Sequence, residues 1–466
     1  MYLIIDQGTS STKAFLLDNN GHITYNRKIT HRLYSPSRNH IECDASEIFN
    51  ACKTLISQSV KVSKNRLILS MGLSVQRSTF LFWDRATIKP VTMALSWQDS
   101  RSKDVVENLK QHSEWIYNTT GLPLSPHFGG PKYQNMINES TALKEKVTNG
   151  EVIFGTLSSY ITHALTKEAA IDHSIASRTL LLDINTSNWS DRCLDLFKIP
   201  KISLPAIKPT KYNYGKVLDY DFSLNCVIGD QQAALIGQNG FSEMSIGMNF
   251  GTSASVLYNS GSTPQLINGL SSSVLFSEKK RKIYVSEGSI NACNSLFYYL
   301  ENVLNIEHEK MRWNERCKNQ DTKGIFISGF SGIAAPYWIS EFDDIYYNIN
   351  KNNRNEVIRS AMESIGFLVN DIIGMIRINT LANFTQITAS GGAARGSLLQ
   401  FIADLSGQFI RRPKMKDKTA LGVYKILNND FENKMTNEGD LFEPKKDLDI
   451  SIKIKQWNDI ISSLKR

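Results

Sequence analysis

The short sequence Gly8-Thr9-Ser10 stands near the start of the chain, and Gly251-Thr252-Ser253 repeats it early in the second half. An apolar run at residues 2–5 precedes the first copy, and another at residues 14–17 follows it, before the turn sequence 19–21. This order predicts a β-hairpin with a polar tip. Glycine lets backbone N–H groups approach an anion closely and the hydroxyls add donors, so such a tip can hold phosphate oxygens.

The second copy has the same surroundings as the first. Residues 248–250 precede it, residues 256–258 follow it, and the sequence Asn259-Ser260-Gly261 supplies the turn. A single Gly-Thr-Ser hairpin is most often an ordinary turn, but two copies with matching flanks are less easily explained in that way. The repetition predicts a nucleotide held between two similar domains.

Length and composition are those of an ordinary globular protein, and 466 residues suffice for roughly two to three domains. The chain has no apolar run of about eighteen residues and no basic-then-apolar leader at Met1, so we expect a cytoplasmic protein that binds no membrane. The net charge is +8, but the lysines and arginines are dispersed, which disfavours nucleic-acid binding. The six cysteines are scattered without a C-x-x-C pair, which disfavours a zinc site or a disulfide scaffold.

Strand-like and helix-like segments follow the same order in both halves of the chain. The pattern predicts an α/β protein of two domains, residues 1–238 and 239–466, with a cleft between them. In the first half we expect strands at 2–5, 14–17, 22–27, 67–74 and 79–83 and helices at 45–62 and 102–109. In the second half we expect strands at 245–250, 254–258 and 282–286 and helices at 292–303, 355–378 and 397–405.

The usual nucleotide-binding motifs are missing, because the chain has neither a G-x-x-x-x-G-K-[ST] loop nor a G-x-G-x-x-G after a strand. Polar clusters at 76–77, 97–101, 229–232 and 390–393 are candidate site residues, although each is also compatible with a surface ion pair, a core residue or a turn. Asp6 is different, because it ends an apolar strand where an uncompensated charge would be costly. Mg²⁺ or its waters would satisfy that carboxylate.

Taken in order, these motifs resemble the FGGY family of carbohydrate kinases over nearly the whole chain, and most of all its glycerol kinases. The resemblance implies two actin-like, ribonuclease-H-like domains that close over MgATP and a small polyol or sugar. The motifs that carry it are Asp6 to Lys13, Gln76-Arg77, Trp97 to Arg101, Asp172 to Thr179, Gly229 to Leu235, Gly251-Thr252, Gly391-Gly392-Ala393 and Thr419 to Gly422.

The resemblance also implies a role for each matching residue. Asp230 would be the general base that accepts the proton of the attacking hydroxyl, and Asp6 would orient Mg²⁺. The phosphates would contact Thr9, Ser10, Lys13, Gly251 and Thr252, the adenosine would lie against Gly391 and Gly392, and the substrate would contact Arg77, Trp97 and Gln231.

Three positions depart from the substrate pocket of glycerol kinases. Ser78 stands in place of a glutamate, His127 in place of a tyrosine, and Ser255 in place of a phenylalanine. These changes predict a roomier and differently bonded pocket lined by Ser78 and His127, and hence a longer polyol or a ketose as substrate, because a site that loses its hydrogen bonds to a substrate discriminates against it.

The nucleotide side departs as well. Asn294 stands in place of a glycine and Tyr298 in place of a glutamine, the segment from Gly391 is one residue short, and Lys13 stands in place of the commoner arginine. Three alternatives therefore stay open: a glycerol kinase proper, a non-catalytic pseudokinase that binds sugar or nucleotide, and an actin- or chaperone-like ATPase. A homo-oligomer is compatible with the resemblance.

Overall fold

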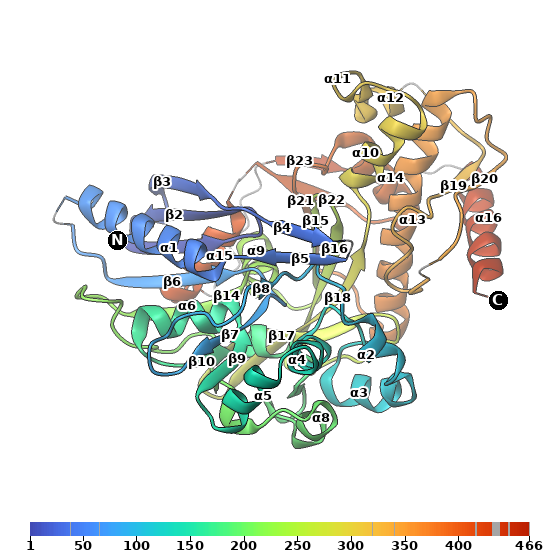
Figure 1. The fold of residues 1–466 in the computed structure, drawn as a ribbon. Helices are drawn as coiled ribbons and strands as arrows, with labels where there is room; N and C mark the ends of the chain where they lie inside the picture. Colours follow the sequence, from blue (N-terminus) through green and yellow to red (C-terminus); the bar gives the residue numbers. More distant parts are fainter. Residues whose placement is uncertain are drawn as a thin grey trace.

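Two mixed β-sheets, one from each half of the chain, form the centre of the molecule (Figure 1). The structure is a computed structural model that describes the chain except for residues 38, 65, 319, 340, 415–416, 431–438, 446–447 and 466. The first sheet contains β1 (Tyr2–Gln7), β2 (Ser11–Leu17), β3 (Ile23–Thr30), β6 (Ser70–Val75) and β14 (Leu224–Gly229). The second contains β15 (Ser245–Phe250), β16 (Ala254–Gly261), β17 (Ser271–Glu278), β18 (Arg281–Ile290), β21 (Gln386–Ser390), β22 (Ile410–Pro413) and β23 (Gly439–Phe442).

The two sheets share one topology. The first has the strand order β3-β2-β1-β6-β14, and the second contains the matching order β18-β16-β15-β21-β22, with β17 and β23 added at its edges. In each sheet the hairpin strand that precedes the Gly-Thr-Ser triplet pairs antiparallel with its partner and parallel with the next strand. The duplicated hairpins that the sequence predicted are therefore confirmed, and they occupy equivalent places in the two halves.

A third sheet and most of the shorter helices lie beside the first sheet. That sheet has the order β4-β5-β8-β7-β9 and consists of β4 (Tyr34–Ser37), β5 (His40–Cys43), β7 (Phe80–Asp84), β8 (Ala94–Leu95) and β9 (Val152–Thr156). Two-stranded ladders join β10 (Ala170–Asp172) to β13 (Ala206–Lys208), β11 (Leu182–Asp183) to β12 (Asn188–Trp189), and β19 (Ile325–Ile327) to β20 (Ile345–Tyr347).

The helices cover the sheets. Those of the first half are α1 (Ala45–Val62), α2 (Lys103–Glu107), α3 (Ser113–Thr120), α4 (Gly129–Asn138), α5 (Thr141–Thr148), α6 (Leu157–Thr166), α7 (His173–Ala176), α8 (Asp191–Phe197) and α9 (Asp230–Asn239), with 3₁₀ turns at Lys110–His112 and Lys201–Ser203. Those of the second half are α10 (Asn294–Val303), α11 (His308–Met311), α12 (Trp313–Lys318), α13 (Arg354–Thr380), α14 (Gly396–Ser406), α15 (Lys418–Leu427) and α16 (Leu448–Leu464). None of the helices in the described ranges is long and apolar enough to cross a membrane.

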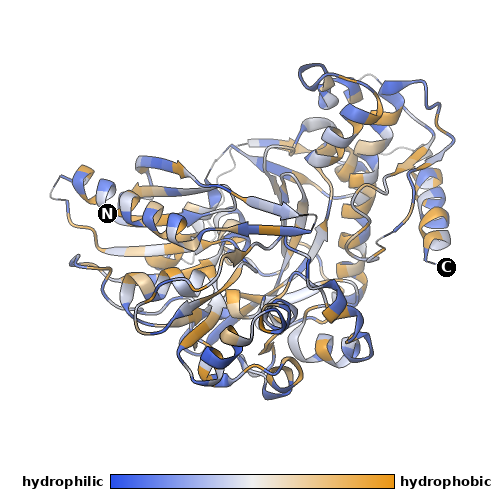
Figure 2. Ribbon diagram, viewed as in Figure 1, coloured by the Kyte–Doolittle hydropathy of each residue, from blue (hydrophilic) through white to orange (hydrophobic). Residues whose placement is uncertain are grey.

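Helix α1 shows how the sequence sets one of these elements. Asp44 caps its N-terminus by accepting hydrogen bonds from the backbone N–H groups of Ser46 and Glu47. Its buried side chains include Ile48, Cys52, Leu55 and Ser59, which recur at helical spacing and face the first sheet. Figure 2 shows hydrophobic and hydrophilic residues interspersed along this helix.

Two helices cross between the halves of the molecule. Helix α9 packs on β15 and β21 of the second sheet and on β14 and β6 of the first, while α15 packs on β1, β6 and β14 of the first sheet and crosses α9 (Figure 1). A Cβ atom at Gly237 of α9 would lie 1.9 Å from the backbone oxygen of Lys418, and one at Gly422 of α15 would lie 1.9 Å from that of Ala233. The two glycines therefore let the helix backbones touch. The domain boundary at residues 238–239 stays a prediction.

The edge strand β17 is also bonded to the first half along its length. The Ser272 N–H donates to the Gly121 carbonyl at 2.7 Å, the Val274 N–H to the Ser177 hydroxyl at 2.9 Å, and the Ser277 N–H to the Thr210 hydroxyl at 3.2 Å. These bonds, together with the packing of α9 and α15, hold the two halves of the molecule together.

Candidate active site

The first hairpin presents Asp6 and Lys13 opposite one another. They are direct partners in the β1–β2 ladder, and the Lys13 ammonium lies 3.6 Å from the carboxylate of Asp417, just before α15. Burial and the neighbouring Asp230 raise the pKa of Asp6 to about 7, while Lys13 acts in the opposite direction. The tip itself is closed by a 2.9 Å bond from the Gly8 N–H to the Ser11 carbonyl, and Ser10 is exposed.

The second hairpin tip is closed by a tighter turn, in which the Gly251 N–H donates to the Ser253 carbonyl at 2.8 Å, two residues on instead of three. The start of α10 is bonded to this tip, because the N–H of Asn294 donates to the Gly251 carbonyl at 3.0 Å. The Asn294 side chain is held by its neighbours, since its amide donates to the Tyr298 hydroxyl at 2.7 Å and accepts from the Trp313 indole at 3.3 Å. Thr252 is exposed at the tip.

Gly391 and Gly392 follow β21 and lie beside this second hairpin. Gly391 has a φ of +99°, and a Cβ atom there would lie 2.1 Å from the Phe250 carbonyl oxygen, so only glycine fits. A Cβ atom at Gly392 would meet no atom within 4 Å. The backbone at Gly392 thus borders open space next to the second tip.

Asp230 is the first residue of α9 and lies directly after β14. Its carboxylate accepts a 2.8 Å hydrogen bond from the Gln231 N–H and lies 3.7 Å from Nε of Arg77. Burial raises the pKa of Asp230, and the Arg77 charge opposes that rise. A carboxylate with a raised pKa beside a helix N-terminus is suited to accept a proton.

Arg77 is fixed by a buried carboxylate from the other half of the chain. Its two terminal nitrogens donate to both oxygens of Glu287 on β18, at 2.7 and 2.8 Å, and Arg178 lies 3.4 Å from the same carboxylate. Burial acts to raise the pKa of Glu287, but the two arginines outweigh it and lower that pKa to about 2. This bidentate pair joins the first half to the second beside Asp230.

Trp97 has all of its polar groups bonded. Its backbone N–H donates to the Thr79 hydroxyl at 3.2 Å, its carbonyl lies 3.1 Å from Nδ1 of His127, and its indole N–H donates to the Thr9 hydroxyl at 2.9 Å. The residue is nevertheless 36% exposed. Desolvation and the nearby Lys132 ammonium lower the pKa of His127, so its imidazole is neutral at pH 7.

Gln231 connects the start of α9 to the second hairpin. Its side-chain oxygen lies 3.4 Å from the Asn249 amide nitrogen and 3.4 Å from the Ser255 hydroxyl. Ser78 is buried, with a positive φ of 59°, and its hydroxyl donates to the Arg178 carbonyl at 3.2 Å. The substituted positions Ser78 and Ser255 therefore contribute small hydroxyls, one bonded to the Arg178 carbonyl and the other beside the side-chain oxygen of Gln231.

The structure brings most of the predicted residues into one continuous network. Asp6, Lys13, Asp230, Arg77 and Gln231 are linked by contacts or charge, Trp97 joins them through Thr9 of the first tip, and Gly251 joins them through β15 and Asn249. The sequence analysis missed Glu287 as a partner of Arg77, although an acid within an apolar strand is the signal that singled out Asp6. It also missed Asn249 and Asp417, for which the sequence carries no comparable signal.

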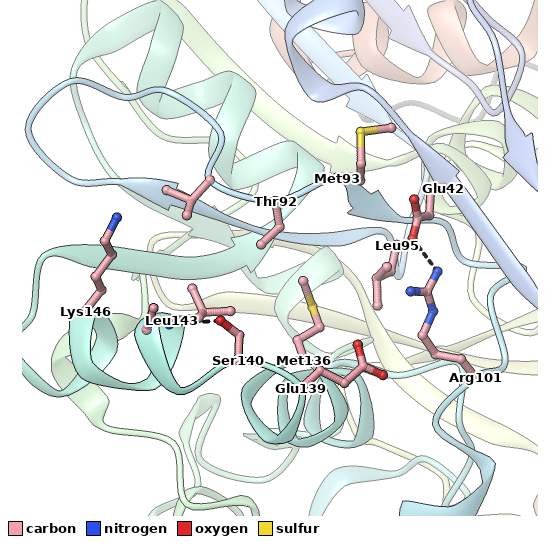
Figure 3. A pocket seen from close by; sticks show the side chains of 12 residues that line it. Glu42, Thr92, Met93, Leu95, Arg101, Met136, Glu139, Ser140, Leu143 and Lys146 are labelled. Carbon is pink, nitrogen blue, oxygen red and sulfur yellow. Dashed lines mark hydrogen bonds and ion pairs between the residues drawn. The ribbon is translucent and has the colours of Figure 1, made fainter. Parts of the chain in front are cut away.

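A groove of about 410 Å³ lies outside this network, between β8 and helices α4 and α5 (Figure 3). Its floor includes Met93, Met136 and Leu143, and Arg101 crosses one end to reach Glu42 at 2.6 Å. Arg101 also holds the buried Asp99 at 2.8 Å. Within the cluster at residues 97–101, Arg101 is therefore an ion-pair partner.

Models of two protein domains match the sequence. The N-terminal domain of the FGGY family of carbohydrate kinases matches residues 1–237, and the C-terminal domain of the same family matches residues 247–427.

The chain belongs to the FGGY family of carbohydrate kinases.

It is similar to the glycerol kinase of Limosilactobacillus reuteri, at 30% identity over 96% of this chain and 94% of that protein, and to that of Bacillus cytotoxicus, at 30% over 90% and 88%. Its structure resembles that of Plasmodium falciparum glycerol kinase with ADP, with a TM-score of 0.91, 27% identity and coverage of 100% and 98%.

This FGGY kinase has the expected fold of two actin-like, ribonuclease-H-like domains. A gluconate kinase structure from Lactobacillus acidophilus shares that fold at a TM-score of 0.87 and 20% identity, covering 99% of this chain and 97% of that one. The family also establishes the expected activity, ATP-dependent phosphorylation of a polyol or sugar.

Proposed function

We propose that this kinase phosphorylates a polyol or ketose larger than glycerol, and that Asp230 is the general base. The observation that carries the proposal is the polar lining around Arg77 and Gln231, where Ser78, His127 and Ser255 replace a carboxylate and two large rings. Since the Gln231 oxygen faces Asn249 and Ser255, its amide N–H groups are left for a substrate hydroxyl.

In the proposed reaction, Asp230 accepts the proton of the substrate hydroxyl as that oxygen attacks the γ-phosphorus. The bond between the γ-phosphorus and the β,γ-bridging oxygen breaks, and ADP leaves with the bonding electrons. Arg77 orients Asp230 through its Nε and donates its remaining N–H groups to the substrate. Trp97 covers the carbon atoms of the substrate, and His127 accepts or donates a hydrogen bond as a neutral imidazole.

The nucleotide would lie between the hairpin tips. Thr9, Ser10 and Lys13 on one tip and Gly251 and Thr252 on the other would hold its phosphates, with Gly391 and Gly392 against the adenosine. Lys13 would exchange its contact with Asp417 for a phosphate oxygen.

Asp6 is the carboxylate that would hold Mg²⁺, and the ion would supply positive charge beside the phosphates. The fit is that of a metal with few protein ligands, because no cluster of three His, Cys, Asp or Glu side chains occurs among the described residues. Mg²⁺ commonly takes one or two carboxylates plus substrate phosphates.

We propose that the enzyme acts in the cytoplasm, because it depends on ATP and its six cysteines are free and buried.

A glycerol kinase proper is the second candidate, because the curated relatives reported above carry that name and Arg77, Trp97, Asp230 and Gln231 are retained. An ADP-release assay with MgATP and glycerol, erythritol, xylitol, ribitol, xylulose, ribulose and sedoheptulose separates the two. We expect kcat/KM for one of the longer compounds to exceed that for glycerol by at least ~10-fold. Ser78→Glu is the matched variant and should move the preference back toward glycerol, whereas glycerol as the best wild-type substrate refutes the proposal.

A further inference from the structure

Lys132 is a buried lysine whose hydrogen-bond acceptors are backbone carbonyls. It lies in the first turn of α4, its side chain is completely buried, and Nζ donates to the Ser78 carbonyl at 2.9 Å and to the Ser96 carbonyl at 2.6 Å. None of the ion pairs found in the described residues includes Lys132. Burying an ammonium group without a carboxylate in contact is costly, so an apolar side chain would fill this volume more cheaply.

The two carbonyls belong to the loops that carry the proposed substrate contacts. Ser78 directly follows Arg77, and Ser96 directly precedes Trp97. A second bond ties the same two loops, because the Trp97 N–H donates to the Thr79 hydroxyl at 3.2 Å. Lys132 therefore lies at the point where the Arg77 and Trp97 loops meet, one residue away from each side chain.

We propose that Lys132 is a positioning residue for substrate binding, which fixes the separation of Arg77 from Trp97 without touching the substrate. This inference rests on the proposed roles of Arg77 and Trp97. It explains why the chain keeps a costly buried amine here, since a displacement of about 1 Å at a reacting site can lower the rate about 10²-fold.

The protonation state of Lys132 does not decide this role. Burial lowers the pKa of Lys132 to about 7, and the nearby Asp99 acts in the opposite direction. An ammonium has three N–H donors and a neutral amine has two, so both carbonyls can be served in either state.

The test compares Lys132→Met with Lys453→Met. Lys453 of α16 is another buried lysine, which is bonded to Glu363 in the second half of the chain and so controls for the loss of a buried ammonium. The readouts are the KM for the fastest substrate of the panel above, the KM for MgATP, and hydrogen exchange of the backbone amides of residues 77–79 and 96–101 in the free protein.

For Lys132→Met we expect the KM for the polyol or ketose to rise at least ~10-fold, with the KM for MgATP within ~3-fold of the wild type. Amide exchange should be faster at residues 77–79 and 96–101. Lys453→Met should change neither the KM for the polyol or ketose nor the amide exchange of these residues. A Lys132→Met protein that keeps the wild-type substrate KM and exchange overturns the proposal, as does one in which both KM values rise equally.

Thr79→Val serves as the second variant if Lys132→Met does not fold. It removes the other bond between the loops at nearly constant volume, so the substrate KM should rise in the same direction by ~3-fold or more. An unchanged KM would then overturn the proposal.

Trp97→Ala separates this inference from the proposed function. If Trp97→Ala leaves the substrate KM unchanged, the assigned substrate site itself is wrong. If Trp97→Ala raises it and Lys132→Met does not, only the positioning role fails.

Discussion

At the scale of single residues, the site depends on charges that are buried together with their partners. Glu287 illustrates this, because Arg77 and Arg178 hold its pKa near 2 although burial acts to raise it. The Arg77–Glu287 pair fixes Arg77 beside Asp230. Removing one partner of this buried pair would leave the other charge unpaired and would destabilise the protein.

Glu287→Gln should therefore lower the melting temperature at pH 7 by roughly 3–5 °C, from a loss of roughly 3–5 kcal/mol. A carboxylate whose pKa is lower in the folded state stabilises the protein above its unfolded pKa, and that contribution is lost as the pH falls toward 2. The difference in melting temperature between wild type and Glu287→Gln should thus be largest at pH 7 and shrink by pH 3, as measured by scanning calorimetry. An equal difference at both pH values would contradict this account of the pair.

At the scale of helices and strands, the crossing of α9 and α15 depends on two glycines. Gly422→Ala would place a methyl group against the Ala233 carbonyl, so we expect the helices to separate and the melting temperature to fall by ~2 °C or more. Gly374→Ala in α13 is the matched control, because its Cβ meets no atom within 4 Å and alanine favours the helix by about 1 kcal/mol. In thermal unfolding, the melting temperature should be highest for Gly374→Ala, lower for the wild type and lowest for Gly422→Ala. A wild-type melting temperature for Gly422→Ala would contradict the close crossing of the two helices.

The sequence predicted elements best where local signals define their ends. Helix α1 spans the predicted residues 45–62 because Asp44 caps it, and β15 spans the predicted 245–250. Strand β1 continues two residues past the predicted end at residue 5, since the polar residues Asp6 and Gln7 still pair with β2. Strand β18 extends to Ile290, beyond the predicted end at residue 286. The predicted strand ended too early because Glu287, which is buried, interrupts the apolar pattern of the sequence.

What the sequence could not predict is which sheet each helix covers. Helices α9 and α15 lie far apart in the chain, and the hydrophobic pattern of a helix gives its buried face but not its partner. Arg77 and Asp230 were recognisable as site residues from their motifs. The pairing of Arg77 with Glu287 could not be predicted, because the two residues lie far apart in the chain and only the fold brings them together. The hydrogen bonds from β17 to Gly121 and Thr210 likewise could not be predicted from the sequence.

At the scale of the whole molecule, the bonds of β17 and the α9–α15 crossing hold the two halves together, and the proposed nucleotide contacts come from the hairpin tips and not from β17. MgADP should therefore slow amide exchange at residues 8–13, 251–253 and 391–395 and leave residues 271–278 unchanged. Hydrogen exchange with mass spectrometry measures this directly. Protection confined to 271–278 would mean that the nucleotide binds elsewhere.

The central claim is that Asp230 is the base of a kinase site assembled from both halves. The most direct measurement is a single-turnover assay of Asp230→Asn with MgATP and the fastest substrate of the panel, together with calorimetric binding of MgADP. We expect phosphoryl transfer to fall by ~10³-fold or more, with MgADP affinity and melting temperature close to wild type. Transfer within ~10-fold of wild type would contradict the assignment of Asp230.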